Sequence, residues 1–362
     1  MELWGKRDDM VVHEREPFNA EPPRGALTGE RQTPVGVFFS RNHGPIPDID
    51  PEAWRLRVDG LVGHPLELSL RELRERFGEV EVEATLQCAG NRRAGLAAVR
   101  DIPGEARWGP GATATARWSG VRLRDVLAEA GLGSQAAHIA FGAPDVSPKA
   151  DPPQPYGGSI PAAKALGPEV LLAWAMNGEP LPRVHGGPLR AVVPGWIGAR
   201  SVKWLTRITA RSQPSAGYFQ ATAYRILPAG ADTARAGPGA GISLGPLPVN
   251  CDILVPDDGA RLPAGPTEIM GYALAGDGRT VARVDVSADA GSNWQQAELD
   301  PADSPWVWQH WRTTLDLAAG ERQVTARAWD STGALMPESP RSLWNPRGYG
   351  NNSWAGIHVT CR

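Results

Sequence analysis

The sequence has few cysteines and no long hydrophobic run. Three cysteines, Cys88, Cys251 and Cys361, are too few and too widely spaced for a disulfide framework, which favours a reducing compartment. No stretch approaches the roughly 18 uninterrupted apolar residues of a membrane span. Residues 1–30 alternate charged and single apolar residues, unlike a signal peptide. We therefore expect a cytoplasmic protein with no membrane association.

Net positive charge is also lacking. Lys and Arg together number 37 against 40 Asp and Glu, a formal net charge of -3 over 362 residues. Such a chain has no overall positive field to attract nucleic acid, so we expect no nucleic-acid partner. Lysine is scarce, occurring as Lys6, Lys149, Lys164 and Lys203, and the other positive charges are arginines. Any anion site must therefore be local.

Glycine and proline are abundant, with 42 and 34 residues, and favour short strands and structured loops. Prolines recur through the first fifty residues, so we expect residues 1–35 to form an extended arm and regular structure to begin near Trp54. A mixed α+β domain is predicted over residues 36–240. Helices are expected at 68–77 with Ser69 as N-cap, 123–130 and 161–166, and strands at 54–60, 80–86, 169–175 and 190–193.

The pattern changes beyond residue 245, where short alternating strands recur between turn signals. Two period-two apolar stripes stand out: Ala282, Val284, Val286 and Ala288, and Val324, Ala326 and Ala328. They predict a β-sandwich of immunoglobulin type over residues 246–362. The Ala-, Gly- and Pro-rich residues 229–245 would be the linker.

Cys88 lies where an apolar strand gives way to a loop with two adjacent arginines, Arg92 and Arg93. Nearby positive charge lowers the pKa of a thiol and favours the thiolate, which is a nucleophile and a soft-metal ligand. Free cysteine is also among the most buried residue types, so position alone leaves a structural role open. No second cysteine lies within zinc-site spacing, so a metal on Cys88 would take most of its ligands from elsewhere, such as a cofactor.

Residues 182–204 gather arginine, histidine, lysine and glycine. Glycines let backbone N–H groups approach an anion, and Arg and Lys neutralise it, as a phosphate requires. The spacing matches neither the P-loop nor the dinucleotide-binding fingerprint. A solvated charged surface is the alternative interpretation of this block.

The string TLQCAGNRR at residues 85–93 resembles the signature of the sulfite oxidase family of molybdenum enzymes, which includes eukaryotic assimilatory nitrate reductases. Further segments match in the same order: FFSRNH at 38–43, YGGSIP at 156–161, MNG at 176–178, HG at 185–186, GARSVKW at 198–204 and WNPRG at 344–348. The resemblance implies a molybdopterin-binding α+β domain followed by an immunoglobulin-like dimerisation domain, which agrees with the division expected from the patterns.

The resemblance also implies a cofactor site. Molybdenum would be held by the dithiolene of a pterin, by oxo groups and by one protein thiolate, Cys88. The cofactor pocket would be lined by Phe39, Ser40, Arg41, Asn42, His43, Asp145, His185, Arg190, Ser201, Val202 and Lys203. Arg190 and Lys203 would meet the cofactor phosphate, residues 201–203 would offer backbone N–H groups, and Asp145 would accept hydrogen bonds from the pterin ring.

The implied substrate site consists of Arg41, Arg93, Trp108, Tyr224 and Arg347. Doubly charged sulfite needs close, rigid cationic donors, which the three arginines would supply. Trp108 and Tyr224 would complete the wall, and the Tyr224 hydroxyl would stabilise charge and assist proton movement. Nitrate reductases of the family generally carry methionine at the position of Arg347, so arginine there favours sulfite.

The resemblance therefore implies oxidation of sulfite to sulfate by oxo transfer, and a homodimer formed through the sandwich. The chain has no Cys-x-x-Cys-His haem motif, and we expect no fused haem domain before residue 35. An external acceptor, such as dioxygen, a cytochrome or another carrier, would then take the electrons. Two alternatives stay open: a reductase of nitrate or a sulfoxide at the same centre, and a non-catalytic binding scaffold.

Overall fold

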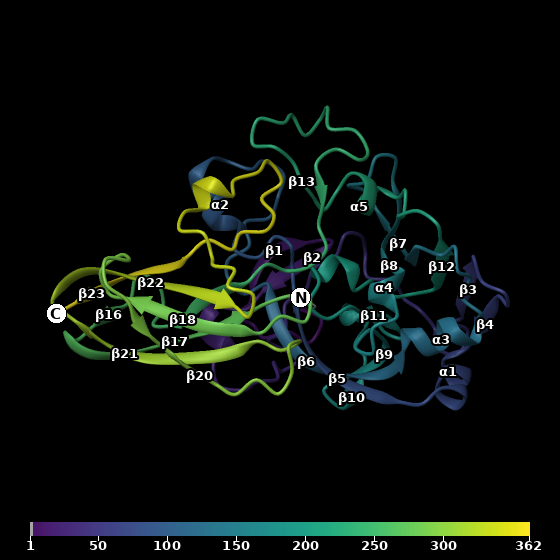
Figure 1. The fold of residues 1–362 in the computed structure, drawn as a ribbon, viewed down its shortest axis with the longest axis horizontal. Coiled ribbons are helices and arrows are strands. Elements are labelled where there is room, and N and C mark those ends of the chain that lie inside the picture. The colour runs from purple at the N-terminus through teal and green to yellow at the C-terminus, as the bar shows by residue number, and fades with distance from the viewer. Residues whose placement is uncertain (1–2) are drawn as a thin grey trace.

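The computed structural model describes residues 3–362, which form an α+β domain and a β-sandwich packed against each other (Figure 1). The α+β domain holds the blue and teal segments, and the sandwich holds the green and yellow ones. This arrangement confirms the predicted fold class. Within the described residues, no helix is long and apolar enough to cross a membrane.

Within residues 3–362, the α+β domain contains two five-stranded sheets. The first is antiparallel: β10 (Glu179–Pro180), β9 (Leu171–Met176), β6 (Thr113–Arg122) and β5 (Val80–Gln87) in that order, with β11 (Arg190–Val192) also on β9. The second has the order β4 (Leu66–Leu68), β3 (Leu56–Gly60), β12 (Arg207–Arg211), β7 (His138–Ser147) and β8 (Gln154–Pro161), with β3 and β12 parallel. The predicted strands are thus all present.

Short helices connect these strands: α1 (Leu70–Arg76), α2 (Arg93–Val99), α3 (Leu123–Glu129), α4 (Ala162–Ala165) and α5 (Tyr218–Ala221), with 3-10 turns η1 (Arg24–Leu27), η2 (Arg183–His185), η3 (Gly198–Arg200) and η4 (Pro340–Ser342). The predicted N-cap of α1 is confirmed. Ser69 Oγ accepts from the Glu72 backbone N–H at 3.2 Å, and the Glu72 carboxylate accepts from the Ser69 N–H at 2.8 Å. This reciprocal pair is a capping box.

The sandwich pairs two sheets across its own core. One has the order β15 (Asn250–Val255), β17 (Gly265–Leu274), β21 (Gln309–Leu317) and β20 (Glu298–Leu299), and the other β16 (Arg261–Leu262), β23 (Ala355–Cys361), β22 (Gly320–Asp330), β18 (Val281–Ser287) and β19 (Gln295–Gln296). A short ladder of β13 (Arg225–Ile226) and β14 (Ile242–Ser243) precedes it. Cys251 and Cys361 are free thiols buried in the sandwich core, as expected for structural cysteines.

One predicted stripe is partly wrong. Val324, Ala326 and Ala328 of β22 face the core, but Ala282 of β18 is exposed and Ala288 is half-buried. A bulge between Val281 and Arg283 shifts the register, so Val281 joins Val284 and Val286 in the core. A bulge inserts one residue into the strand and so breaks the simple alternation on which the prediction relied.

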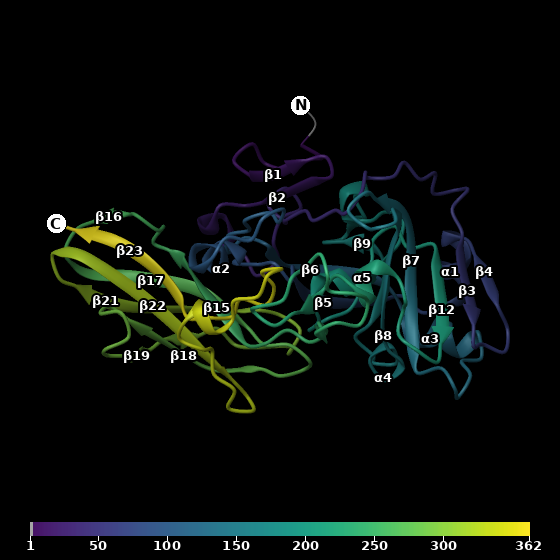
Figure 2. The ribbon, with the colours of Figure 1, turned by 90° about the horizontal axis from the view of Figure 1, so that it is seen from above.

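Regular structure begins much earlier than Trp54. Strands β1 (Val11–Arg15) and β2 (Phe18–Glu21) form a hairpin within the expected arm, and all four residues of β2 are buried. Figure 2 shows this purple hairpin lying across the junction of the two domains. Proline excludes helix but does not exclude an antiparallel hairpin, and tertiary contacts bury this one.

Candidate active site

A partly open cavity with about 630 Å³ of empty volume lies at the carboxyl end of β5. Its walls come from segments far apart in the sequence: Phe38, Phe39, Arg41, Asn42, His43, Leu86, Cys88, Asp145, Tyr156, His185, Arg190, Gly198, Ala199, Ser201, Lys203, Trp204 and Tyr224. Cys88 and most of the residues predicted for the cofactor pocket therefore meet in one place. Ser40 and Val202 are buried but lie outside this lining.

Cys88 is held rigidly at the base of this cavity. Its backbone N–H donates to the Ala112 carbonyl at 2.9 Å, and its sulfur accepts from the Gly90 N–H at 3.4 Å. Burial raises the pKa of the Cys88 thiol, and the charges of Arg41 and Arg93 oppose this only in part. The predicted lowering of the thiol pKa is therefore wrong, because desolvation outweighs the nearby charge. A bound metal ion would remove the proton outright.

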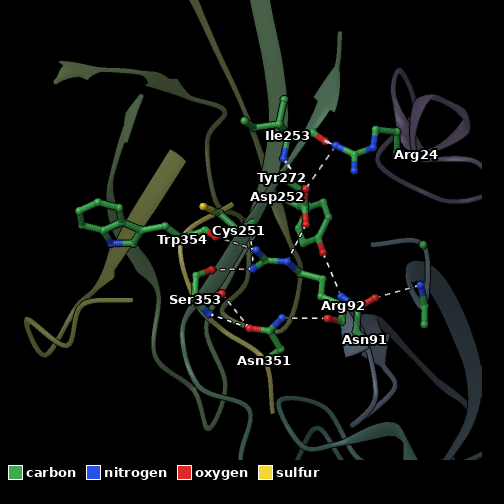
Figure 3. A network of polar contacts seen from close by, with 12 residues as sticks. Arg24, Asn91, Arg92, Cys251, Asp252, Ile253, Tyr272, Asn351, Ser353 and Trp354 are labelled. Atoms are coloured by element: carbon green, nitrogen blue, oxygen red, sulfur yellow. Dashed lines mark hydrogen bonds and ion pairs between the residues drawn. The ribbon is translucent and has the colours of Figure 1, made fainter. Parts of the chain in front are cut away.

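The Arg92 side chain reaches residues of the sandwich, among them Asp252 and Ser353 (Figure 3). Its backbone adopts a left-handed conformation with a φ of 60°, so Arg92 and Arg93 diverge. The Arg92 guanidinium lies 2.8 Å from the Asp252 carboxylate and donates to the carbonyls of Ser353 at 2.8 Å and Trp354 at 2.9 Å. Only one of the two adjacent arginines therefore contributes charge to the thiol.

A second group of contacts connects this loop to the sandwich. Asn351 Nδ2 donates to the Arg92 carbonyl at 2.8 Å, and Asn91 Nδ2 donates to the Tyr272 hydroxyl at 3.2 Å (Figure 3). Tyr272 belongs to the buried cluster that the α+β domain shares with the sandwich. The loop that carries Cys88 is thus fixed from both domains.

Asp145 and Lys203 form the polar end of the cavity. Asp145 Oδ1 is buried without a hydrogen-bond partner among the described residues, and burial raises the pKa of Asp145 to about 7, with Lys203 opposing. The Lys203 ammonium donates to Asn42 Oδ1 and to the Val184 carbonyl, the latter at 3.0 Å. Burial and the charge of Arg190 hold the pKa of Lys203 well below its usual value.

The residues expected to bind the cofactor phosphate, Arg190 and residues 201–203, are arranged differently from the prediction. Arg190 donates to the carbonyls of His185 at 2.9 Å and Ser201 at 3.0 Å, and burial lowers its pKa to about 9. The Ser201 N–H donates to the Gly198 carbonyl at 3.0 Å, so it is already used. Within residues 3–362, the backbone N–H groups of Val202 and Lys203 donate to no other backbone group, and of these two residues Lys203 lines the cavity.

Tyr224 and His43 make a buried hydrogen bond of 2.5 Å between the hydroxyl and Nε2. The His43 ring stacks on Tyr156 with centroids 4.3 Å apart. Burial, reinforced by the charge of Arg41, holds the pKa of His43 well below its usual value, and burial raises that of Tyr224. Both groups are therefore neutral near pH 7, and the Tyr224 hydroxyl is held in place by the His43 ring.

The other predicted substrate residues, Arg93, Trp108 and Arg347, lie outside the cavity lining. Arg93 is only 3% exposed and donates to the carbonyls of Gly348 at 3.1 Å and Ala106 at 3.0 Å. Gly90 gives it room, because a Cβ there would lie 2.7 Å from Arg93 Nη2. The predicted substrate site is thus divided between the cavity and an adjoining layer.

Trp108 and Arg347 each have a polar atom without a partner. Trp108 is buried, its ring lies 4.5 Å from that of His13, and its Nε1 makes no hydrogen bond within the described chain. Arg347 Nε is likewise buried and unpaired there.

Several residues that line or adjoin the cavity were not predicted from the sequence. Tyr156 and Trp204 lie in matching motifs but received no role, although both line the cavity. Tyr349 stacks on Tyr224 at 5.2 Å and was not singled out. Lys6, from the expected arm, places its ammonium 2.5 Å from His185 Nε2, and burial lowers its pKa to about 7. Nothing in the local sequence around Lys6 signals this contact.

Comparison with known proteins decides the family. Residues 43–219 match the oxidoreductase molybdopterin binding domain, and residues 243–362 match the Mo-co oxidoreductase dimerisation domain. Sulfite oxidase from Arabidopsis thaliana is 38% identical over 96% of this chain and 93% of its own length. The chain belongs to the sulfite oxidase family.

Other members of the sulfite oxidase family show its range. Mitochondrial sulfite oxidase from Mus musculus is 42% identical over 96% of this chain, and nitrate reductase from Hordeum vulgare is 36% identical over 100% of it. The chain spans 65% of the length of the mouse enzyme and 43% of the barley one. The crystal structure of sulfane dehydrogenase SoxCD from Paracoccus pantotrophus, 28% identical, matches with a TM-score of 0.82 over 97% of this chain and 86% of its own.

The cavity fits the molybdopterin cofactor that the matched domain binds. It offers one soft sulfur on Cys88, an unpaired carboxylate oxygen on Asp145, the basic side chains of Arg190 and Lys203, and the backbone N–H of Lys203. Within residues 3–362, no three His, Cys, Asp or Glu side chains gather as a metal site. The donor set therefore suits a metal that brings most of its ligands with its organic chelator.

Proposed function

We propose that the protein oxidises sulfite to sulfate and passes the electrons to an external acceptor. The observation that carries this proposal is the placement of the buried Cys88 thiol in one cavity with Arg41, while the charge of Arg93 also acts on the thiol. This arrangement combines a soft-metal ligand with cations that attract an oxyanion. Relatives named sulfite oxidase support the choice of substrate.

The chain's own residues would hold the cofactor at both ends. Cys88 would ligate the molybdenum, Arg190 and Lys203 would pair with the phosphate, and the unpaired Asp145 oxygen would accept hydrogen bonds from the pterin. When bound, this group supplies the two-electron redox chemistry. Phe38 and Phe39, both buried, would exclude water from the wall beside it.

The substrate would bind through three cations. Arg41, Arg93 and Arg347 neutralise a dianion, which a single cation in a desolvated site cannot do. Tyr224, hydrogen-bonded to His43, would donate from its hydroxyl to a substrate oxygen and hold the proton there. His43 would keep the phenol oriented.

A second candidate is nitrate reduction at the same centre, favoured by the 36% identity to barley nitrate reductase. Nitrate carries one negative charge and needs fewer cations, whereas this chain has arginine at position 347. We therefore place sulfite first. A homodimer through residues 243–362 and a cytoplasmic location complete the proposal, and light scattering and cell fractionation would test them.

The deciding experiment compares Cys88→Ser with Cys361→Ser, a matched change of a cysteine buried in the sandwich. Full-length protein from a host that makes the cofactor is assayed for molybdenum, for sulfite-dependent acceptor reduction and by X-ray absorption. We expect the Cys88 variant to keep pterin, to lose one sulfur ligand from the molybdenum spectrum and to lose nearly all turnover. The Cys361 variant should keep the pterin, the sulfur ligand and the turnover. A wild-type protein with no molybdenum would favour the scaffold, and one with molybdenum but no sulfite turnover would refute the proposed substrate.

A further inference from the structure

The carboxylate of Glu105 lies next to Arg93, one of the three arginines proposed to bind the substrate. Glu105 Oε2 lies 3.4 Å from Arg93 Nη1, and the Glu105 side chain is 24% exposed. It comes from the loop between α2 and β6, which also supplies the Ala106 carbonyl that accepts from the same Arg93 nitrogen at 3.0 Å. A negative charge at this position works against the anion binding that the three arginines promote.

The charge of Glu105 acts on several groups at the Cys88 end of the site. It contributes to the pKa values of Arg41, Cys88 and Tyr224, which line the cavity, and to that of Tyr349, which stacks on Tyr224. The other acidic residue of this loop is different: Asp101 pairs with Arg107 at 2.8 Å on the surface, where both side chains are more than half exposed. The loop therefore offers one internal and one external carboxylate for comparison.

Glu105 also fixes which edge of Arg93 remains free. Arg93 Nε donates to the Gly348 carbonyl, and Nη1 is used by Ala106 and Glu105. Within the described residues, Arg93 Nη2 donates no hydrogen bond, and it lies so close to Gly90 that a Cβ there would be 2.7 Å away. Nη2 is therefore the Arg93 nitrogen that could contact an anion without giving up a hydrogen bond or the contact with Glu105.

We propose that Glu105 is a specificity-determining residue that lowers the anion affinity of the site and holds Arg93 with its Nη2 edge toward the substrate. Three arginines and one carboxylate leave two net positive charges, which match the two negative charges of sulfite. The inference rests on the proposed function for the identity of the substrate, but it concerns anion binding and is testable without turnover.

The test measures dissociation constants for sulfate, a dianion, and nitrate, a monoanion, with the holoenzyme by titration calorimetry. Glu105→Gln removes the charge and keeps an acceptor oxygen for Arg93. Because Coulomb energy scales with ligand charge, we expect sulfate to bind about fivefold more tightly and nitrate about twofold more tightly. In sulfite turnover KM should fall with little change in kcat. Asp101→Asn, the matched control, should change neither constant.

Two further variants separate the charge of Glu105 from its contact with Arg93. Glu105→Asp keeps the charge and should retain wild-type anion affinity, whereas Glu105→Ala also loses the acceptor and should bind both anions less tightly than Glu105→Gln. Unchanged or weaker sulfate binding by a folded Glu105→Gln protein would overturn the inference. Tighter sulfate binding in an enzyme that does not oxidise sulfite would leave the inference standing and refute the proposed function instead.

Discussion

The Arg92 guanidinium pairs with the Asp252 carboxylate at 2.8 Å and thereby ties the loop that carries Cys88 to the sandwich. Arg92→Ala should destabilise the protein by about 3–5 kcal/mol, because it leaves a buried carboxylate without its main cation. Urea unfolding measures this effect. Arg71→Ala, which removes an exposed pair with Glu75, should cost less than about 1 kcal/mol. Equal costs for the two variants would show that the interdomain pair is no more than a surface contact.

Glu21 joins the hairpin to the segment that carries Trp108. Its carboxylate accepts from the N–H groups of Gly109 at 2.6 Å and Gly111 at 2.8 Å. Glu21→Gln places an amide donor against one of these N–H groups and should cost about 1–3 kcal/mol in the free energy of unfolding. Hydrogen exchange of residues 109–111 should rise in parallel. Glu16→Gln, at the exposed turn of the hairpin, is the control, and protection that is equal in both variants would contradict the prediction.

Asp145 should give the cofactor-free protein a pH-dependent stability. Its pKa is about 7 in the folded chain, above the ordinary value near 4, so the folded state binds the proton more tightly. The resulting stabilisation is complete below about pH 4 and is lost as the pH rises through about 7. Asp145→Asn removes this contribution, so its urea midpoint should fall less than that of wild type between pH 5 and pH 8. Asp316→Asn, on the exposed face of β21, should show the same change in urea midpoint as wild type. If the Asp145 variant also shows the wild-type change, Asp145 is not the source of the pH dependence.

Arg347→Met should separate the two candidate substrates. Loss of a charge-assisted hydrogen bond to sulfite should lower kcat/KM about 30- to 100-fold, whereas nitrate reduction should change less than about threefold. Steady-state assays with both anions measure this. Arg341→Met, an exposed change nearby, should leave both activities intact. A similar loss for both anions would mean that Arg347 supports the site without reading substrate charge.

Local patterns predicted most of the fold because its strands alternate regularly and its first helix carries a capping box. The β2 strand escaped prediction because its burial depends on contacts with residues 40–42 and 109–111, far along the chain. The β18 stripe failed at one bulge. Periodicity reports which residues share a face, but it does not report an inserted residue or a distant partner.

The candidate site was predictable as a set but not as an arrangement. Motifs identified Cys88, Arg41 and Lys203, and the fold brings them into one cavity. Sequence adjacency suggested that Arg92 and Arg93 act together on the thiol, whereas the left-handed backbone at Arg92 separates them. The sequence also could not predict whether the pKa of the Cys88 thiol is raised or lowered, because this depends on how much water the fold excludes from around the sulfur.

The absence of a side chain at Gly90 determines where the Arg93 guanidinium can lie. Since a methyl group there would come within 2.7 Å of the Arg93 guanidinium, alanine at this position would push the cation aside without altering any charge. A small increase in side-chain volume at residue 90, two residues from Cys88, would therefore be expected to weaken the oxyanion binding proposed for this site.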